Sequence, residues 1–221
     1  MGNVNFGLPK KETEYLRTVM LLKTLVEGGT YYGGTAFEQS RLFETIYTIE
    51  KSNIIFEKAK EKIQKIRNII QLKGDTREHL PKILSKIDNI LFWLDAHWSG
   101  GNTYGQKDEC PILEELEIIF SSPIKNFAIL IDDARLFLAP PPLPHNLKSW
   151  PTIQQLVKVI PNEFDIIINN DVIFIVPKKI NFPKYIQSKI ISKNNKVTIK
   201  SLSTVFFSKI SKMLNISKKK L

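Results

Sequence analysis

Five short apolar runs alternate with segments of helical periodicity, and this alternation limits the folds open to the chain more than any other feature. Strands that alternate with helices form parallel β-α units, whose sheet is covered by helices on both faces. The runs lie at 24–27, 45–50, 68–73, 89–95 and 126–133, and the helical segments between them lie at 52–66, 76–87 and 110–122.

The pattern changes after the fifth run. Segment 150–160 predicts a helix with Pro151 in its first turn, and two apolar runs then flank residues 169–171, Asn-Asn-Asp, which is a hairpin signal. Segment 10–23 predicts one amphipathic helix before the first strand. We therefore expect an α/β fold with a Rossmann-like, doubly wound, mostly parallel seven-stranded sheet that ends in a C-terminal antiparallel hairpin.

The net charge of +10 is concentrated in one segment, because 12 of the 32 basic residues lie from Lys178 to the end, where there is no Asp or Glu. We expect a globular domain over 1–177 and a lysine-rich, partly helical extension over 178–221. From Ser201 the spacing is that of an amphipathic helix, which predicts contact with an anionic membrane surface. A solvated tail and a helix packed on the domain are the alternatives. Nucleic acid is not an expected partner, because the domain has no basic patch with interleaved aromatic residues.

The single cysteine, Cys110, excludes an intramolecular disulfide and fits a reducing compartment. No segment offers the run of about 18 apolar residues that a membrane-spanning helix needs. The N-terminus also lacks the apolar core of a signal peptide. We expect a cytoplasmic protein, with membrane association only through the tail, and the composition does not determine the oligomeric state.

The first predicted strand ends in a glycine-rich turn, at the edge where open α/β sheets bind their ligands. The stretch Val26–Ala36, VEGGTYYGGTA, places four glycines in seven residues between a strand and a helix. Glycines there allow a tight turn and a close approach of the backbone to a ligand. Glu27 would repel a phosphate, so the turn favours a ligand with a positive centre or an amino group. A plain junction of strand and helix is the alternative.

The second and third runs are followed by acidic residues as well. Glu50 lies 21 residues after Gly29, a spacing typical of a residue that accepts hydrogen bonds from both ribose hydroxyls. Asp75 is placed to accept a hydrogen bond from an adenine amino group. The same carboxylate is equally suited to cap the next helix, and the two roles are compatible.

Three carboxylates close the fourth and fifth runs, namely Asp95, Asp132 and Asp133. Adjacent parallel strands lie ~5 Å apart, so these carboxylates would meet and repel one another. A hard divalent cation such as Mg²⁺ would relieve the repulsion. The alternative is that Asp133 points away and caps a turn, or pairs with Arg135.

His97 lies two residues after Asp95 and is suited to take a proton from a substrate hydroxyl, because the pKa of histidine lies near neutral pH. A structural histidine and a metal ligand are the alternatives. We expect the glycine-containing loop 99–110 to cover the site as a lid, and the proline-rich segment 139–145 to form a stiff element on the same side.

Together these residues resemble the class I S-adenosylmethionine (SAM)-dependent methyltransferases over Thr24–Val176. The glycine turn is similar to the E-x-G-x-x-x-G-x-[ST] turn of catechol-type and macrocin-type O-methyltransferases, which are metal dependent. The stretch 92–137 also resembles a family of small uncharacterised bacterial methyltransferase-like proteins.

The resemblance implies SAM as the cofactor and Mg²⁺ bound by Asp95, Asp132 and Asp133. It implies that the glycine turn holds the methionine part of SAM and that Glu50 holds the ribose. The predicted catalytic residues are His97 and Asp95. The predicted cofactor-binding residues are Glu27, Gly29, Thr30, Gly33, Gly34, Thr35, Glu50, Asp75, Thr76 and Asp95.

Two positions depart from the family pattern. Gly28 stands where the family usually has a bulky apolar residue, and Asp95 is followed by Ala-His-Trp-Ser rather than by a catalytic lysine. His97, or the metal alone, would then replace the lysine. The expected function is methyl transfer to an oxygen of a small acceptor such as a sugar or a phenol. The alternatives are a non-catalytic methyltransferase-like protein that binds a ligand or a partner, and a nicotinamide-dependent oxidoreductase, which the glycine spacing disfavours.

Overall fold

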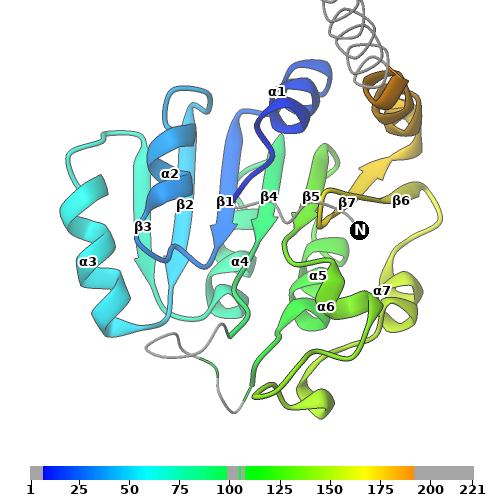
Figure 1. Cartoon of the computed structure of the whole chain (residues 1–221). Coiled ribbons are helices and arrows are strands. Elements are labelled where there is room, and N and C mark those ends of the chain that lie inside the picture. Colours follow the sequence, from blue (N-terminus) through cyan, green and yellow to red (C-terminus); the bar gives the residue numbers. More distant parts are fainter. Residues whose placement is uncertain (1–6, 99–104, 106–107, 192–221) are drawn as a thin grey trace, which may run out of the picture. The chain divides into compact units, whose positions relative to one another are not determined.

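The computed structural model describes residues 7–98, 105 and 108–191 (Figure 1). The chain divides into two compact units, Met1–Ile180 and Asn181–Leu221. In the second unit the described residues 182–191 are helical. The predicted boundary after residue 177 stays a prediction, and the amphipathic helix predicted from Ser201 lies outside the described residues. No helix in the described part of the chain has the length and apolar character needed to cross a bilayer.

The first unit is built on one seven-stranded sheet with the strand order β3-β2-β1-β4-β5-β7-β6. The pairs among β1 to β5 are parallel, whereas β7 is antiparallel to both β5 and β6. This arrangement confirms the predicted sheet. The strands are β1 (Thr24–Gly28), β2 (Thr45–Glu50), β3 (Ile69–Lys73), β4 (Ile90–Leu94), β5 (Phe127–Ile131), β6 (Phe164–Asn169) and β7 (Val172–Pro177).

Helices cover both faces of the sheet, as the alternation of elements predicted. Figure 1 shows α1 and α2 in front of the sheet and α4 and α5 behind it. The helix α5 packs on both α4 and α7. The helices are α1 (Lys10–Val19), α2 (Gly34–Gln39), α3 (Asn53–Ile63), α4 (Thr76–Leu84), α5 (Ile112–Phe120), α6 (Arg135–Leu138) and α7 (Ile153–Val159), and two single 3₁₀ turns lie at Leu147–Ser149 and Lys178–Ile180.

The central strands are apolar along their whole length because both of their faces are covered. Every residue of β1, β4 and β5 is buried. Phe92 and Trp93, neighbours on β4, are both fully buried although they point to opposite faces. Phe92 packs against Phe127 of β5, with ring centroids 6.1 Å apart. A strand in this position cannot alternate between apolar and polar residues.

Local signals placed most of the element ends correctly. Ser52 accepts a hydrogen bond from the Ile55 N–H and caps α3. Asn170 and Asp171 at the hairpin tip have φ of 48° and 66°, which fits a two-residue type I′ turn. The prediction of Pro151 in the first turn of a helix is wrong. The helix α7 starts at Ile153, because Thr152 is the N-cap of a full capping box with Gln155.

Gly29 is the tightest point of the glycine turn. Its φ is +87°, and a Cβ atom at this position would lie 2.4 Å from the backbone oxygen of Asp95. The turn after β1 and the end of β4 therefore touch through their backbones, which leaves no room for a side chain.

We expect Gly29→Ala to lower the melting temperature by about 4–8 °C, because strain and a backbone clash of this kind cost about 2 kcal/mol. Gly34→Ala is the matched control. The nearest atom to its added Cβ would be Lys62 Nζ at 3.9 Å, and its melting temperature should stay within about 2 °C of wild type. Thermal unfolding followed by circular dichroism measures both, and equal stability of the two variants would contradict this account of the turn.

Candidate functional site

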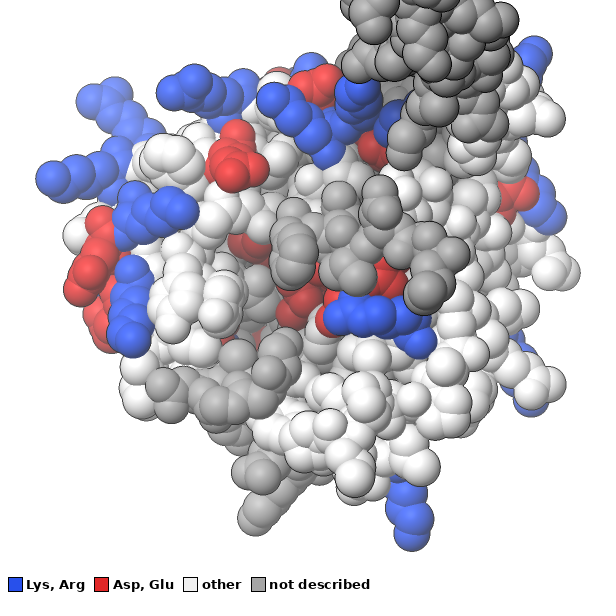
Figure 2. Space-filling view, viewed as in Figure 1, with Lys and Arg blue, Asp and Glu red and all other residues white. Residues whose placement is uncertain are grey.

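The polar residues predicted from the strand ends come together at the carboxyl edge of the parallel strands. The strand order reverses between β1 and β4, which is where an open α/β sheet forms its ligand crevice. The Asp95 N–H donates to the Gly28 oxygen at 2.9 Å, and the Asp132 N–H donates to the Leu94 oxygen at 3.2 Å. Figure 2 shows acidic side chains in a hollow over these strand ends, with most Lys and Arg at the margin of this face.

Neighbouring backbone and side chains hold the glycine turn in place. The Gly29 and Thr30 N–H groups both donate to the Ile49 oxygen of β2, at 3.0 and 3.1 Å. Gly33, with φ of +71°, is the N-cap of α2. Gly28 departs from the family pattern for a local reason: a Cβ there would lie 3.1 Å from Thr76 Oγ1. The space that a bulky residue would occupy is taken by the start of α4.

Glu27 is a buried carboxyl at the end of β1. Its Oε2 accepts a hydrogen bond of 2.5 Å from the Thr48 hydroxyl, and Thr48 lies 2.6 Å from the Thr30 hydroxyl. Burial raises the pKa of Glu27 from 4.5 to about 8. The nearby charges of Asp95 and Glu50 also raise this pKa, whereas the hydrogen bond from the Thr48 hydroxyl lowers it. Glu27 therefore keeps a proton at neutral pH in the absence of a cationic partner.

Glu50 connects β2 with the glycine turn. Its Oε1 accepts a hydrogen bond from the Ser52 N–H at 2.8 Å, and its Oε2 accepts one from the Tyr31 N–H at 3.1 Å. Burial raises its pKa in spite of these bonds. Tyr31 has φ of 47°, a conformation uncommon for a tyrosine. The contact with Glu50 fixes the turn relative to β2.

Asp75 is the N-cap of α4, which is one of its two predicted roles. One oxygen accepts from the Arg77 N–H at 2.9 Å, and the other pairs with Lys51 and Arg77, both at 2.7 Å. Burial raises the pKa of Asp75, but the hydrogen bonds from Arg77 and Lys51 outweigh burial and hold it well below its usual range. The predicted contact with an adenine amino group stays a prediction.

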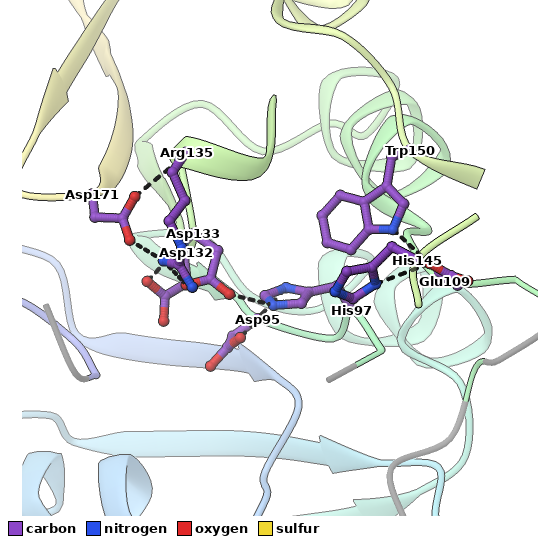
Figure 3. Close-up of polar contacts among 9 residues, drawn as sticks. All are labelled: Asp95, His97, Glu109, Asp132, Asp133, Arg135, His145, Trp150 and Asp171. Carbon is purple, nitrogen blue, oxygen red and sulfur yellow. Dashed lines mark hydrogen bonds and ion pairs between the residues drawn. The ribbon is translucent and has the colours of Figure 1, made fainter. Parts of the chain in front are cut away.

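The aspartates after β4 and β5 form a cluster with His97 and Arg135 (Figure 3). His97 Nε2 lies 2.8 Å from Asp133 Oδ2, and His97 Nδ1 lies 3.5 Å from Asp95 Oδ1. Arg135 Nη1 donates to Asp133 Oδ1 at 2.6 Å. The predicted alternative in which Asp133 pairs with Arg135 is thus the arrangement in the structure.

The pKa values of the residues in this cluster are shifted in opposite directions. Burial raises the pKa of Asp95 to about 6, and burial with repulsion from Asp95 raises that of Asp132 to about 8. For Asp133, burial acts in the same direction, but the hydrogen bond from His97 and the charge of Arg135 lower its pKa. Burial lowers the pKa of His97, but the hydrogen bond to Asp133 and the charge of Asp95 outweigh it and raise the pKa. Asp133 is therefore the ionised anchor of the cluster.

The three predicted Mg²⁺ ligands do not present three open carboxylates. Both oxygens of Asp133 accept hydrogen bonds from side chains, and Asp132 Oδ1 accepts one from the Asp133 N–H at 2.8 Å. Among the residues that the structure describes, no group of three or more His, Cys, Asp or Glu side chains is arranged to hold a metal ion. The chemistry of Asp95 and Asp132 suits a cation, but the arrangement around Asp133 does not, and Mg²⁺ binding stays a prediction.

Sequence reasoning missed the residues that pack behind His97. Glu109, which is buried, accepts hydrogen bonds from the Trp150 indole N–H at 2.7 Å and from His145 at 3.1 Å. The Trp150 ring lies 5.4 Å from the His97 ring. These residues are far apart in the chain, and no spacing or motif connects them. Most of the predicted lid, 99–104 and 106–107, lies outside the described residues.

No protein-family model matches the chain, and no curated protein matches it either. Solved structures do. A Staphylococcus aureus protein provisionally named as a caffeoyl-CoA O-methyltransferase aligns over 78% of this chain and 86% of its own, with a TM-score of 0.55 at 13% identity. The chain has the class I SAM-dependent methyltransferase fold. At this identity the similarity concerns the methyltransferase fold alone. An O-methyltransferase from Bacillus cereus, solved with SAH, aligns over 77% of this chain and 82% of its own at 13% identity, with a TM-score of 0.49.

The raised pKa of Glu27 has a consequence for the stability of this methyltransferase fold. Between pH 4.5 and about 8 the folded state keeps a proton that the unfolded state releases, so Glu27 lowers the stability progressively as the pH rises through this window. We expect Glu27→Gln to match wild type near pH 4.5 and to melt at least about 2 °C higher at pH 8. Thermal unfolding across this pH range tests it. Glu44→Gln, at an exposed position, should show no pH-dependent difference from wild type.

Proposed function

We propose that this protein binds SAM at the carboxyl edge of its sheet and transfers the methyl group to an oxygen of a small acceptor. One observation carries the proposal: Glu27, Glu50 and Asp95 surround the glycine turn, and burial raises the pKa of each carboxyl. The positive charge near these carboxyls is too small to offset the effect of burial on their pKa values. SAM carries a sulfonium and an ammonium group, so it would supply the positive charge that this crevice lacks.

The geometry of the turn supports the same ligand. Gly29 brings the β1 turn against the end of β4, so a ligand can approach the backbone closely at this point. Glu50 accepts a hydrogen bond from the Tyr31 N–H of the same turn, which supports a role for Glu50 in binding the ribose beside the region proposed to hold the methionine part. An extended ligand with an amino group near Glu27 and a ribose near Glu50 fits this order of residues.

When bound, SAM would supply an electrophilic methyl group to the acceptor oxygen, and the electron pair of the broken carbon–sulfur bond would go to sulfur. The hydroxyl proton is taken by His97. Because Asp133 is ionised and can only accept, His97 Nε2 is the donor of their 2.8 Å bond, which leaves Nδ1 as the nitrogen that can take a proton. Asp133 and Asp95 would then stabilise the imidazolium that forms. No step of this mechanism passes through a metal ion.

The acceptor class is proposed on two grounds. The bond between His97 Nε2 and Asp133 supports His97 as the base for a hydroxyl, and the S. aureus protein with the similar fold is named as an O-methyltransferase. A sugar or a phenol meets both requirements. A cytoplasmic location and membrane contact through the lysine-rich tail remain part of the proposal, and residues 192–221 of that tail lie outside the described residues.

The first test is titration calorimetry with SAM and SAH. We expect wild type to bind both, and Glu50→Gln to weaken binding at least tenfold, about 1.4 kcal/mol, because the variant loses the charged acceptor for the ribose hydroxyls. Glu44→Gln is the matched control, since Glu44 is an exposed glutamate paired with Lys23, and it should bind like wild type. A folded wild type that binds neither compound would rule out the proposal. Binding without methyl transfer to any of a panel of sugars and phenols would favour the non-catalytic alternative.

SAM binding should also release protons at pH 7. The positive charge of SAM lowers the pKa of Glu27 from about 8, so a proton leaves this carboxyl when the ligand binds. SAH lacks the sulfonium charge and should release fewer protons. Calorimetry in buffers of different ionisation enthalpy measures the number released, and equal numbers for the two compounds would show that the sulfonium lies away from these carboxyls.

A further inference from the structure

We propose that Asp133 anchors His97 and Arg135 instead of ligating a metal, and that the three aspartates therefore do not form a divalent-cation site. Both Asp133 oxygens are used, one by His97 Nε2 at 2.8 Å and the other by Arg135 Nη1 at 2.6 Å (Figure 3). A cation that took Asp133 as a ligand would have to share one of these oxygens with its donor or displace that donor. The inference deepens the proposed function, because it concerns what the proposed methyl transfer requires, and it rests on that function for its meaning.

The guanidinium of Arg135 is fixed by a second anchor, the tip of the β6–β7 hairpin. Asp171 at this tip pairs with the Arg135 guanidinium through one oxygen and accepts from the Arg135 N–H at 2.9 Å through the other. The Ala134 N–H donates to the Asp171 backbone oxygen at 2.8 Å. The hairpin therefore holds the start of α6 and the Arg135 side chain together. Moving Arg135 away from Asp133 would disturb the bonds to Asp171 as well.

The imidazole of His97 is fixed on its other sides. Its side chain is only 6% exposed, and its two ring nitrogens face Asp95 and Asp133. The Trp150 ring packs 5.4 Å from it and is itself held by the hydrogen bond to Glu109. The ring thus lies between two of the three carboxylates that a three-aspartate metal site would use. An ion that joined Asp95 to Asp133 would have to displace this packed ring.

Charge supports the same conclusion. Arg135 is permanently cationic and is the direct partner of Asp133, so a divalent ion bound to Asp133 would lie next to a positive charge. The guanidinium and the ring N–H already supply the hydrogen-bond donors that an ionised, half-buried Asp133 needs. The carboxylates that stay open to a cation, Asp95 and Asp132, are two rather than three.

The experiment measures Mn²⁺ binding by electron paramagnetic resonance on the full chain, with and without SAM. We expect no saturable site in wild type at low millimolar Mn²⁺. The double variant His97→Ala/Arg135→Gln frees Asp133 and should gain a site at least about tenfold tighter than any wild-type binding. Adding Asp132→Asn should remove this gain. Arg41→Gln removes a positive charge at an exposed position and should gain nothing.

Two results would overturn the proposal. One is a tight Mn²⁺ site in wild type that Asp133→Asn abolishes, and the other is a folded double variant that binds no better than wild type. If the double variant fails to fold, the imidazole ¹⁵N resonances of wild type decide the question. They should keep the His97 Nε2–H signal at millimolar Mg²⁺, and loss of that signal would show that the ion displaces the ring. Failure to bind SAM would refute the proposed function but leave these metal results intact.

Discussion

The backbone contact between β1 and β4 is the constraint on which the rest of this molecule depends. The two strands pair in parallel at the point where the strand order reverses, and Gly29 brings the turn after β1 against the Asp95 oxygen. Because the backbones touch, the residues that follow both strands share one small volume. The hydrogen bond from the Asp132 N–H to Leu94 adds the end of β5 to it. The acidic edge is thus a consequence of strand pairing.

Burying these carboxyls close together destabilises their ionised forms, and the two parts of the site differ in how far this is offset. Around the glycine turn the effect of burial is not offset, since Glu27 and Glu50 have raised pKa values. Around β5 the chain supplies its own positive partners, and Asp133 has a lowered pKa between His97 and Arg135. The carboxyls of the first region lack a cationic partner, whereas Asp133 in the second region already has two. This difference favours SAM at the turn and a metal-free anchor at Asp133.

Much of the fold could be predicted because its signals are local. The five parallel strands follow from apolar runs that must be buried on both faces, and the hairpin follows from residues 169–171 that tolerate positive φ. The predicted site residues also lie at one sheet edge, since parallel strands place their carboxyl ends together. The start of α7 was wrong by a few residues because a capping box at Thr152 outweighed the usual position of Pro151. Prediction therefore succeeded where periodicity or strand order determined position.

By itself the sequence determined which residues stand at the strand ends: the glycines and Glu27 after β1, and the aspartates after β4 and β5. Only the tertiary structure decided their partners. Asp171 reaches Arg135 from a hairpin 36 residues away, and Trp150 reaches Glu109 over 41 residues. Such contacts are not marked by any periodic pattern in the sequence, because they depend on how loops from separate β-α units pack against one another. The same packing decided that Asp133 holds a histidine and an arginine.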